Sequence, residues 1–135
     1  MSRCVGTATL ARVITVMLLE HPRPMLRVLR DSLAGQAGLR IVGEAGTLVR
    51  ALMLARRLCP DVLVLDAEIP GLDAVSAIRA LRQETPESAI VVISIEPDRL
   101  RPVMRGDDRA LAIGKVEGAD ALLSAIRRLG SNGPD

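Results

Sequence analysis

Five short apolar runs, separated by longer segments of helical periodicity, are the feature that most constrains how this chain folds. The runs span Val13–Leu19, Leu39–Val42, Val62–Leu65, Ala89–Ile93 and Ala110–Ile113. Most are β-branched and nearly continuous in hydrophobicity, which is typical of strands buried on both faces of a parallel sheet. The second run is interrupted by Arg40, which favours a place at the edge of the sheet.

The segments between the runs carry apolar residues three and four positions apart, as amphipathic helices do. This spacing is found in Leu26–Leu33, Leu48–Ala55, Val75–Leu81 and Leu122–Leu129. The remaining segment contains Pro102, which an α-helix accepts only in its first turn, so a short or irregular helix is expected there. Strict alternation predicts a doubly wound α/β fold, with a five-stranded parallel sheet covered by helices on both faces.

Composition narrows the functions open to such a domain. The 135 residues include no Phe, Tyr or Trp, so no aromatic platform for single-stranded nucleic acid can be built. The net charge of +2 comes from scattered basic residues, and direct nucleic-acid binding is not expected. Val13–Leu19 is too short to span a membrane and lacks the cleavage region of a signal peptide, so no membrane association is expected and a cytoplasmic location is expected by default. Cys4 and Cys59 lack the spacing of a metal site or disulfide framework, and we read both as reduced.

A single domain is expected over residues 12–129. Residues 1–11 have no clear periodicity and are expected to form a loose leader, whereas residues 130–135 form a polar tail. Such a tail is too short to hold an output module.

Polar residues suited to phosphoryl chemistry end four of the apolar runs. Glu20 follows the first run, Asp66 the third and Ser94 the fourth, and Lys115 lies just past the fifth. Ligands of open α/β sheets bind beyond the carboxyl ends of the strands, where these side chains would meet. A carboxylate can attack phosphorus, and one or two carboxylates suffice for Mg²⁺. Lysine supplies a point charge and serine a hydrogen bond for phosphoryl oxygens.

Lys115 strengthens this interpretation, because it is the only lysine among 18 basic residues. The alternative interpretation is that polar residues simply belong at strand ends. Four suitable residues in a suitable order favour a functional site.

Three stretches resemble the receiver domain of bacterial two-component response regulators, in particular receivers of the NarL/LuxR type. The most specific is Pro60–Asp73, which is similar to the family's third strand, phosphoacceptor aspartate and Pro-Gly loop. Glu20-His21-Pro22 resembles the residues after the first strand, and Ile41–Ala45 the second strand and the turn after it. Glu44 and Asp73 are expected in solvated turns. The resemblance extends over about residues 12–129 and implies the flavodoxin-like strand order 2-1-3-4-5.

The resemblance implies a role for each candidate residue. Asp66 would be the phosphoacceptor, Ser94 the phosphoryl-sensing hydroxyl and Lys115 the phosphate-binding lysine. Glu20, Asp66 and the backbone carbonyl of Glu68 would bind Mg²⁺. The implied partner is a histidine kinase, and pairing is common among such receivers, so a homodimer is a further expectation.

The chain departs from the family's pattern at four positions. Leu19 replaces the first of two adjacent acids, which leaves fewer carboxylates to attract Mg²⁺. Ile95 is bulky where the family has a small residue, Ala112 replaces the aromatic ring of the usual switch, and Val116 stands where many members have proline. The Glu68 side chain is a candidate to replace the missing acid in the metal site.

Two functions are compatible with this pattern. The first is a signalling receiver that accepts a phosphoryl group on Asp66 from a histidine kinase. The alternative is a pseudo-receiver, an interaction domain that phosphorylation does not switch. Asp66-Ala67-Glu68 also resembles the acid pair of aspartate-nucleophile phosphatases, but those enzymes place the pair after the first strand and need lid structure. No enzymatic activity is therefore expected.

Overall fold

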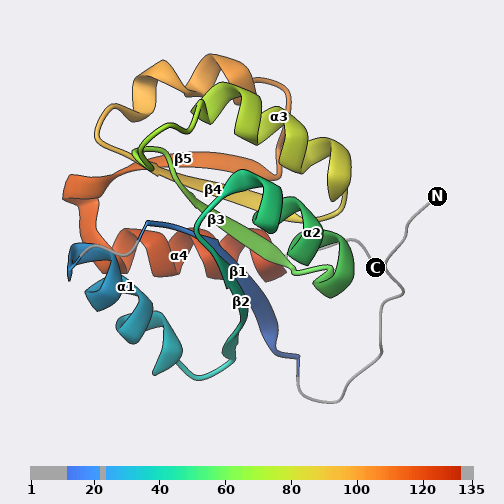
Figure 1. Ribbon diagram of the computed structural model, residues 1–135. Coiled ribbons are helices and arrows are strands. Elements are labelled where there is room, and N and C mark those ends of the chain that lie inside the picture. The colour runs from blue at the N-terminus through green and yellow to red at the C-terminus, as the bar shows by residue number, and fades with distance from the viewer. Residues whose placement is uncertain (1–11, 22–23, 132–135) are drawn as a thin grey trace.

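Parallel pairing runs through the whole sheet of the computed structural model, which describes residues 12–21 and 24–131. The strand order is β2-β1-β3-β4-β5, so the predicted fold class and order are confirmed (Figure 1). The edge position expected from Arg40 is also confirmed, because β2 ends the sheet on one side. The strands are β1 (Ile14–Leu19), β2 (Leu39–Ala45), β3 (Val62–Asp66), β4 (Ala89–Ser94) and β5 (Ala110–Gly114).

Helices and short 3₁₀ turns connect the strands. The irregular helix expected around Pro102 consists of two 3₁₀ turns, each with a proline in its first two residues. The last helix continues to Ser131, so Gly130 and Ser131, expected in the polar tail, belong to the helix; residues 1–11 and 132–135 lie outside the described part. The helical elements are α1 (Pro24–Ala34), α2 (Leu48–Leu58), α3 (Ala74–Glu84), η1 (Pro97–Arg99), η2 (Arg101–Met104), η3 (Lys115–Glu117) and α4 (Gly118–Ser131).

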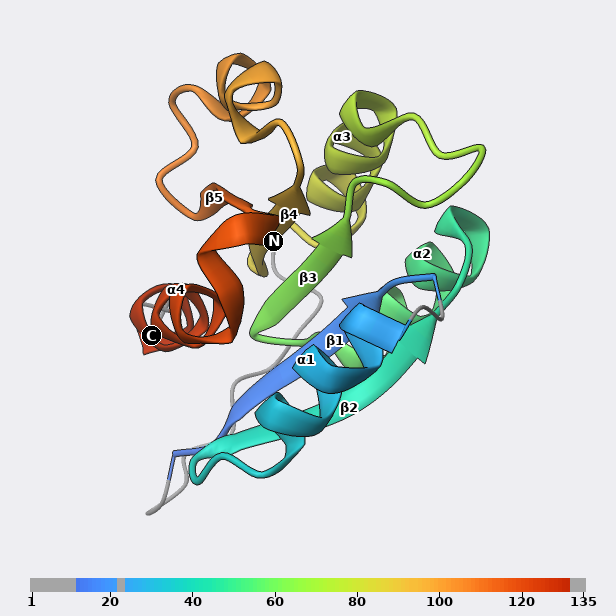
Figure 2. The ribbon, with the colours of Figure 1, turned by 90° about the vertical axis from the view of Figure 1, so that its left-hand side faces the viewer.

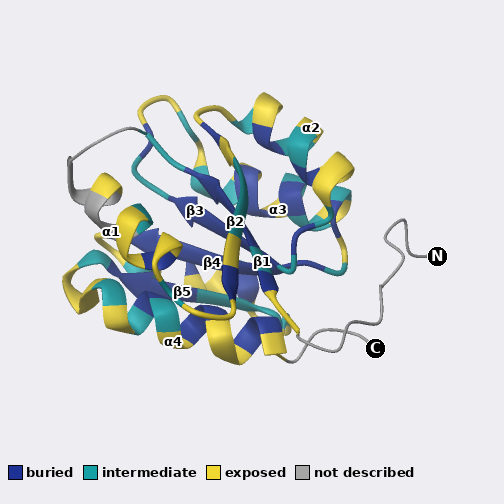
Figure 3. Ribbon diagram, turned by 90° about the horizontal axis from the view of Figure 1, so that it is seen from below, coloured by how far each residue is buried: buried dark blue, intermediate teal, exposed yellow. Residues whose placement is uncertain are grey.

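Two hydrophobic clusters hold helices to the two faces of the sheet. One joins Ala51 and Ala55 of α2, Ile78 of α3 and Met104 of η2 to the strands. The other joins α1 and α4 to the opposite face. Every residue of β3 and β4 is buried between these layers, while the outward helix faces are exposed (Figure 3). The continuous apolar runs thus have the double burial that their composition indicates.

The structure also bears on the cysteines and on the expected absence of a membrane span. Cys59 is half-buried and disulfide-bonded, so the expectation of a reduced thiol at this position is wrong; Cys4 lies outside the described residues. Among the described helices, none has the length and apolar character needed to cross a bilayer.

Candidate functional site

The parallel register brings the carboxyl ends of the strands to one edge of the sheet (Figure 2). Asp66 is the last residue of β3 and pairs with Ile93, and Ser94 is the last residue of β4 and pairs with Gly114. Lys115 follows β5 directly, and Glu20 follows β1. All four residues expected at this edge therefore lie there.

The two oxygens of the Asp66 carboxylate have different surroundings. Oδ1 accepts a hydrogen bond from the backbone N–H of Glu68 at 3.0 Å and lies 3.0 Å from Lys115 Nζ. Oδ2 is buried and has no hydrogen-bond partner within the described residues. Burying an unpaired acceptor is costly, and such an atom in a native fold calls for a functional explanation. Oδ2 is therefore available to bind a cation or to act as a nucleophile.

Lys115 connects two carboxylates. Its Nζ lies 3.0 Å from Oδ1 of Asp66 and 3.0 Å from Oε1 of Glu68, and its side chain is 12% exposed. Burial acts to lower the pKa of Lys115, but the hydrogen bonds and charges of Glu68 and Asp66 outweigh it and raise the pKa above the usual range. Lys115 is therefore a fixed cation at the sheet edge.

The Glu68 carboxylate binds donors from β4 and the residue after it. Ser94 Oγ donates to Oε2 at 3.2 Å, and the backbone N–H of Ile95 donates to Oε1 at 3.0 Å. Ser94 Oγ in turn accepts a hydrogen bond from the N–H of Glu96 at 3.0 Å. Sequence reasoning considered this side chain as a metal ligand; the structure instead engages it with Lys115, Ser94 and Ile95.

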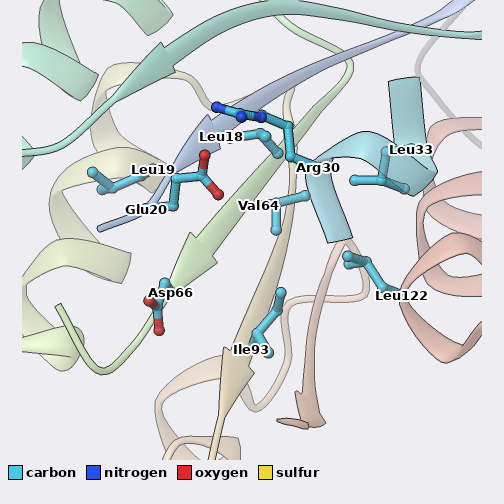
Figure 4. A pocket seen from close by; sticks show the side chains of 9 residues that line it. All are labelled: Leu18, Leu19, Glu20, Arg30, Leu33, Val64, Asp66, Ile93 and Leu122. Carbon is cyan, nitrogen blue, oxygen red and sulfur yellow. The ribbon is translucent and has the colours of Figure 1, made fainter. Parts of the chain in front are cut away.

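Glu20 and Asp66 line the same pocket, together with Arg30 of α1 (Figure 4). Burial raises the pKa of Glu20 to about 7, with further contributions from a hydrogen bond with Glu44 and from the charges of Glu44 and Asp66; Arg30 acts in the opposite direction. The other lining residues are apolar: Leu18, Leu19, Leu33, Val64, Ile93 and Leu122. Glu20 is thus a carboxylate that is difficult to ionise in the metal-free site.

Glu44 and Arg30 belong to this part of the site although sequence reasoning did not include them. Glu44 lies in β2 rather than in the expected turn, and its Oε1 is 3.1 Å from Nη1 of Arg30. The signal for Glu44 was an acid two residues past the second apolar run, Leu39–Val42. Arg30 gave no signal, because arginines recur along the whole sequence.

The residues present fit a magnesium ion in number and kind. Mg²⁺ binds through one or two carboxylates and completes its shell with water and phosphate oxygens. Glu20 and Asp66 supply two carboxylates, and Asp66 Oδ2 is an unpaired acceptor among the described residues. No cluster of three or more His, Cys, Asp or Glu side chains suited to a metal occurs in the described part of the chain. The third protein ligand would therefore have to be a backbone group.

The positions that depart from the family pattern lie around the site. Ile95 and Val116 are 67% and 99% exposed beside it, so both form an apolar rim. Ala112 is buried in the same cluster as Leu100 and Met104, which come from the 3₁₀ segment. Aliphatic side chains thus pack around a position where the aromatic ring would be.

Comparisons with known proteins agree with this architecture. A protein-glutamate methylesterase/protein-glutamine glutaminase of Anaeromyxobacter dehalogenans is 30% identical over 112 residues, which are 83% of this chain and 30% of that protein. The chain therefore spans under a third of that relative. The response regulator domain of Thermotoga maritima CheB has a TM-score of 0.76 at 26% identity, covering 91% of this chain and 100% of that one.

A receiver of the NarL type also has this fold. The signal receiver domain of the putative response regulator NarL from Mycobacterium tuberculosis superposes with a TM-score of 0.72 at 24% identity, over 90% of this chain and 98% of that one. The sequence profile of the response regulator receiver domain matches residues 16–127. The chain belongs to the family of response regulator receiver domains, which are signalling domains.

Proposed function

We propose that this domain accepts a phosphoryl group on Asp66 from a histidine kinase. The observation that carries the proposal is the asymmetric Asp66 carboxylate. One oxygen is held by Lys115 and the N–H of Glu68, while the other is buried and unpaired among the described residues. A buried carboxylate with one free oxygen beside a fixed cation is suited to nucleophilic attack on phosphorus.

The proposed reaction is a transfer between two side chains. A carboxylate oxygen of Asp66 attacks the phosphorus of a phosphohistidine, the P–N bond breaks, and the histidine leaves with the electron pair. The product is an acyl phosphate on Asp66. Lys115 would neutralise charge on the transferred oxygens, and the Ser94 hydroxyl would donate a hydrogen bond to one of them.

Magnesium would be held by Glu20, Asp66 and the backbone carbonyl of Glu68. The ion would supply positive charge next to the phosphoryl oxygens. Glu20 must be ionised to bind it, and Arg30 opposes the rise of the Glu20 pKa. The loss of an acid at Leu19 leaves two carboxylates, which is enough for Mg²⁺ but weaker than three.

Intact-mass spectrometry after incubation with acetyl phosphate and Mg²⁺ tests the proposal. We expect one phosphoryl adduct on the wild-type protein that is lost in mild base, and none on Asp66→Asn. Asp108→Asn, which changes an exposed aspartate, should retain the adduct. An unmodified wild-type protein, or an adduct that persists in Asp66→Asn, would contradict the proposal.

A pseudo-receiver is the second candidate function. It is favoured by Ala112, which is buried in the same aliphatic cluster as Leu100 and Met104 and leaves no ring to move. In that case Mg²⁺ with beryllofluoride, a phosphoryl mimic, should not raise the melting temperature, and Asp66→Asn should leave partner binding unchanged. A clear rise in melting temperature that Asp66→Asn abolishes favours the receiver function instead.

Receiver domains interact with histidine kinases in two-component systems. A histidine kinase is proposed as the partner of this chain. A homodimer of this domain and a cytoplasmic location are proposed as well. We further propose that this domain acts as a signalling module and is itself no enzyme, and that it contacts neither nucleic acid nor membrane directly.

A further inference from the structure

The Glu68 carboxylate lies at the meeting point of three hydrogen-bond donors. Lys115 Nζ and the backbone N–H of Ile95 are each 3.0 Å from Oε1, and Ser94 Oγ is 3.2 Å from Oε2. The donors come from β4, from the residue after it and from the turn after β5. An ammonium, a hydroxyl and an amide that converge on one point form a binding site for an oxyanion.

A phosphoryl group on Asp66 would need the same donors. Lys115 already lies 3.0 Å from Asp66 Oδ1, so oxygens carried by that carboxylate would fall within its reach. Its ammonium has three donor hydrogens, and it currently serves both Asp66 and Glu68. The hydroxyl of Ser94 has a single hydrogen, which Glu68 accepts. Lys115, Ser94 and the Ile95 N–H therefore cannot supply hydrogen bonds to both the Glu68 carboxylate and a phosphoryl group on Asp66.

We propose that the Glu68 side chain is a built-in competitor that occupies the phosphoryl-oxygen site until Asp66 is modified. This inference rests on the proposed function of Asp66 and specifies how that site is regulated. Phosphorylation displaces the Glu68 carboxylate, and Ser94, Ile95 N–H and Lys115 pass to the phosphoryl oxygens. Because Glu68 belongs to the segment between β3 and α3, its release transmits the event to that segment without an aromatic switch at position 112.

Removing the competing carboxylate should strengthen binding of a phosphoryl mimic. We expect Glu68→Gln and Glu68→Ala to lower the beryllofluoride concentration at half-saturation, measured by thermal shift with Mg²⁺, by about tenfold, the ratio equivalent to about 1.4 kcal/mol. Glu68→Gln keeps the size of the side chain, so the test survives if Glu68→Ala folds poorly. Glu96→Gln is the matched control, because it removes an exposed charge next to Ser94 and weakens only the exposed ion pair with Arg99, while Lys115, the Ser94 hydroxyl and the Ile95 N–H keep their contacts with Glu68.

Amide hydrogen exchange at Ile95 provides a second measurement. The Ile95 N–H donates to Glu68 Oε1, so Glu68→Ala should accelerate its exchange. Mg²⁺ with beryllofluoride should slow the exchange again in that variant, because the mimic replaces the lost acceptor.

The outcomes separate this inference from the proposed function. If the wild-type protein binds beryllofluoride and the Glu68 variants bind no better, or if Glu96→Gln gives the same gain, competition by Glu68 is overturned and the receiver function stands. Binding by Glu68→Ala but not by the wild type supports the competition most strongly. Absence of binding in every variant overturns both.

Discussion

Around Asp66, the Lys115 ammonium contacts two carboxylates, and a third carboxylate, that of Glu20, lines the adjoining pocket. Lys115 contacts Asp66 and Glu68, while Glu20, the residue after β1, lines the same pocket and is hydrogen-bonded to Glu44. Carboxylates held close together in a partly buried site favour protonation of one of them. Burial and these neighbours place the extra proton on Glu20. At the scale of single residues, the metal-free site is therefore sensitive to pH in the neutral range.

The raised pKa of Glu20 predicts a pH dependence of stability in the metal-free protein. The folded state holds the proton up to a pKa of about 7, whereas the unfolded chain releases it near the ordinary glutamate pKa of 4.5. The folded state therefore binds more protons between these values, and the contribution of Glu20 is full below that window and lost as pH rises through it. Glu20→Gln should flatten the fall in urea midpoint between about pH 5 and about pH 7.5.

Glu87→Gln provides the control for this measurement. Glu87 lies just before β4, at the amino ends of the strands and opposite the site. Its substitution should therefore leave the dependence of the urea midpoint on pH unchanged. An equal slope in the wild type and in Glu20→Gln would show that Glu20 titrates normally.

At the scale of elements, Arg82 holds the end of α3 to the amino edge of the sheet. Its guanidinium donates to both carboxylate oxygens of Asp107, at 2.8 and 3.3 Å. It also donates to the carbonyls of Ser88 at 2.6 Å and Arg109 at 3.3 Å, which immediately precede β4 and β5. One planar fork thus fixes the starts of two strands, and the carboxyl ends of those strands carry Ser94 and Lys115.

Arg82→Ala should lower the free energy of unfolding by about 2 kcal/mol, because it leaves partly buried carbonyls and a carboxylate without their charged donor. Urea denaturation measures this change. Arg79→Ala, on the exposed side of the same helix, should change stability by less than about 0.5 kcal/mol. Similar losses from both variants would mean that the Arg82 contacts contribute nothing beyond surface charge.

At the scale of the whole molecule, α4 lies close against the sheet because residue 130 has no side chain. A Cβ on Gly130 would lie 2.6 Å from Cγ2 of Ile14 and 3.2 Å from Cγ2 of Val62. The last turn of the helix therefore packs on the first residues of β1 and β3. This contact closes the layer formed by α1 and α4 at the end opposite the site.

Gly130→Ala should destabilise the domain by about 1–3 kcal/mol, since β-branched Ile14 and Val62 cannot move aside easily. Intrinsic propensity alone would give the opposite sign, because alanine is favoured over glycine in a helix by about 1 kcal/mol. Thermal denaturation followed by circular dichroism gives the sign. Gly35→Ala, where the nearest atom to the new Cβ is Asp31 O at 3.8 Å, should be neutral or slightly stabilising.

The sequence by itself determined the sheet and the places of Asp66, Ser94 and Lys115 at strand ends, but not the end of β2, which continues past the expected Val42 to Ala45. Doubly buried parallel strands have a continuous apolar composition, so their ends can be read directly, and Asp66, Ser94 and Lys115 follow from those ends. The 3₁₀ segment was equally readable, because proline excludes an α-helix interior by local sterics.

Only the tertiary structure decided which groups contact one another at the sheet edge. Glu68 was placed correctly in the loop after β3, but its binding to Lys115 and Ser94 depends on how three loops converge. The hydrogen bond between Glu20 and Glu44 likewise depends on the register between β1 and β2. Local composition specifies whether a residue is in a strand, a helix or a loop. The partner of a polar side chain is set by distances between segments far apart in sequence, and these exist only in the folded chain.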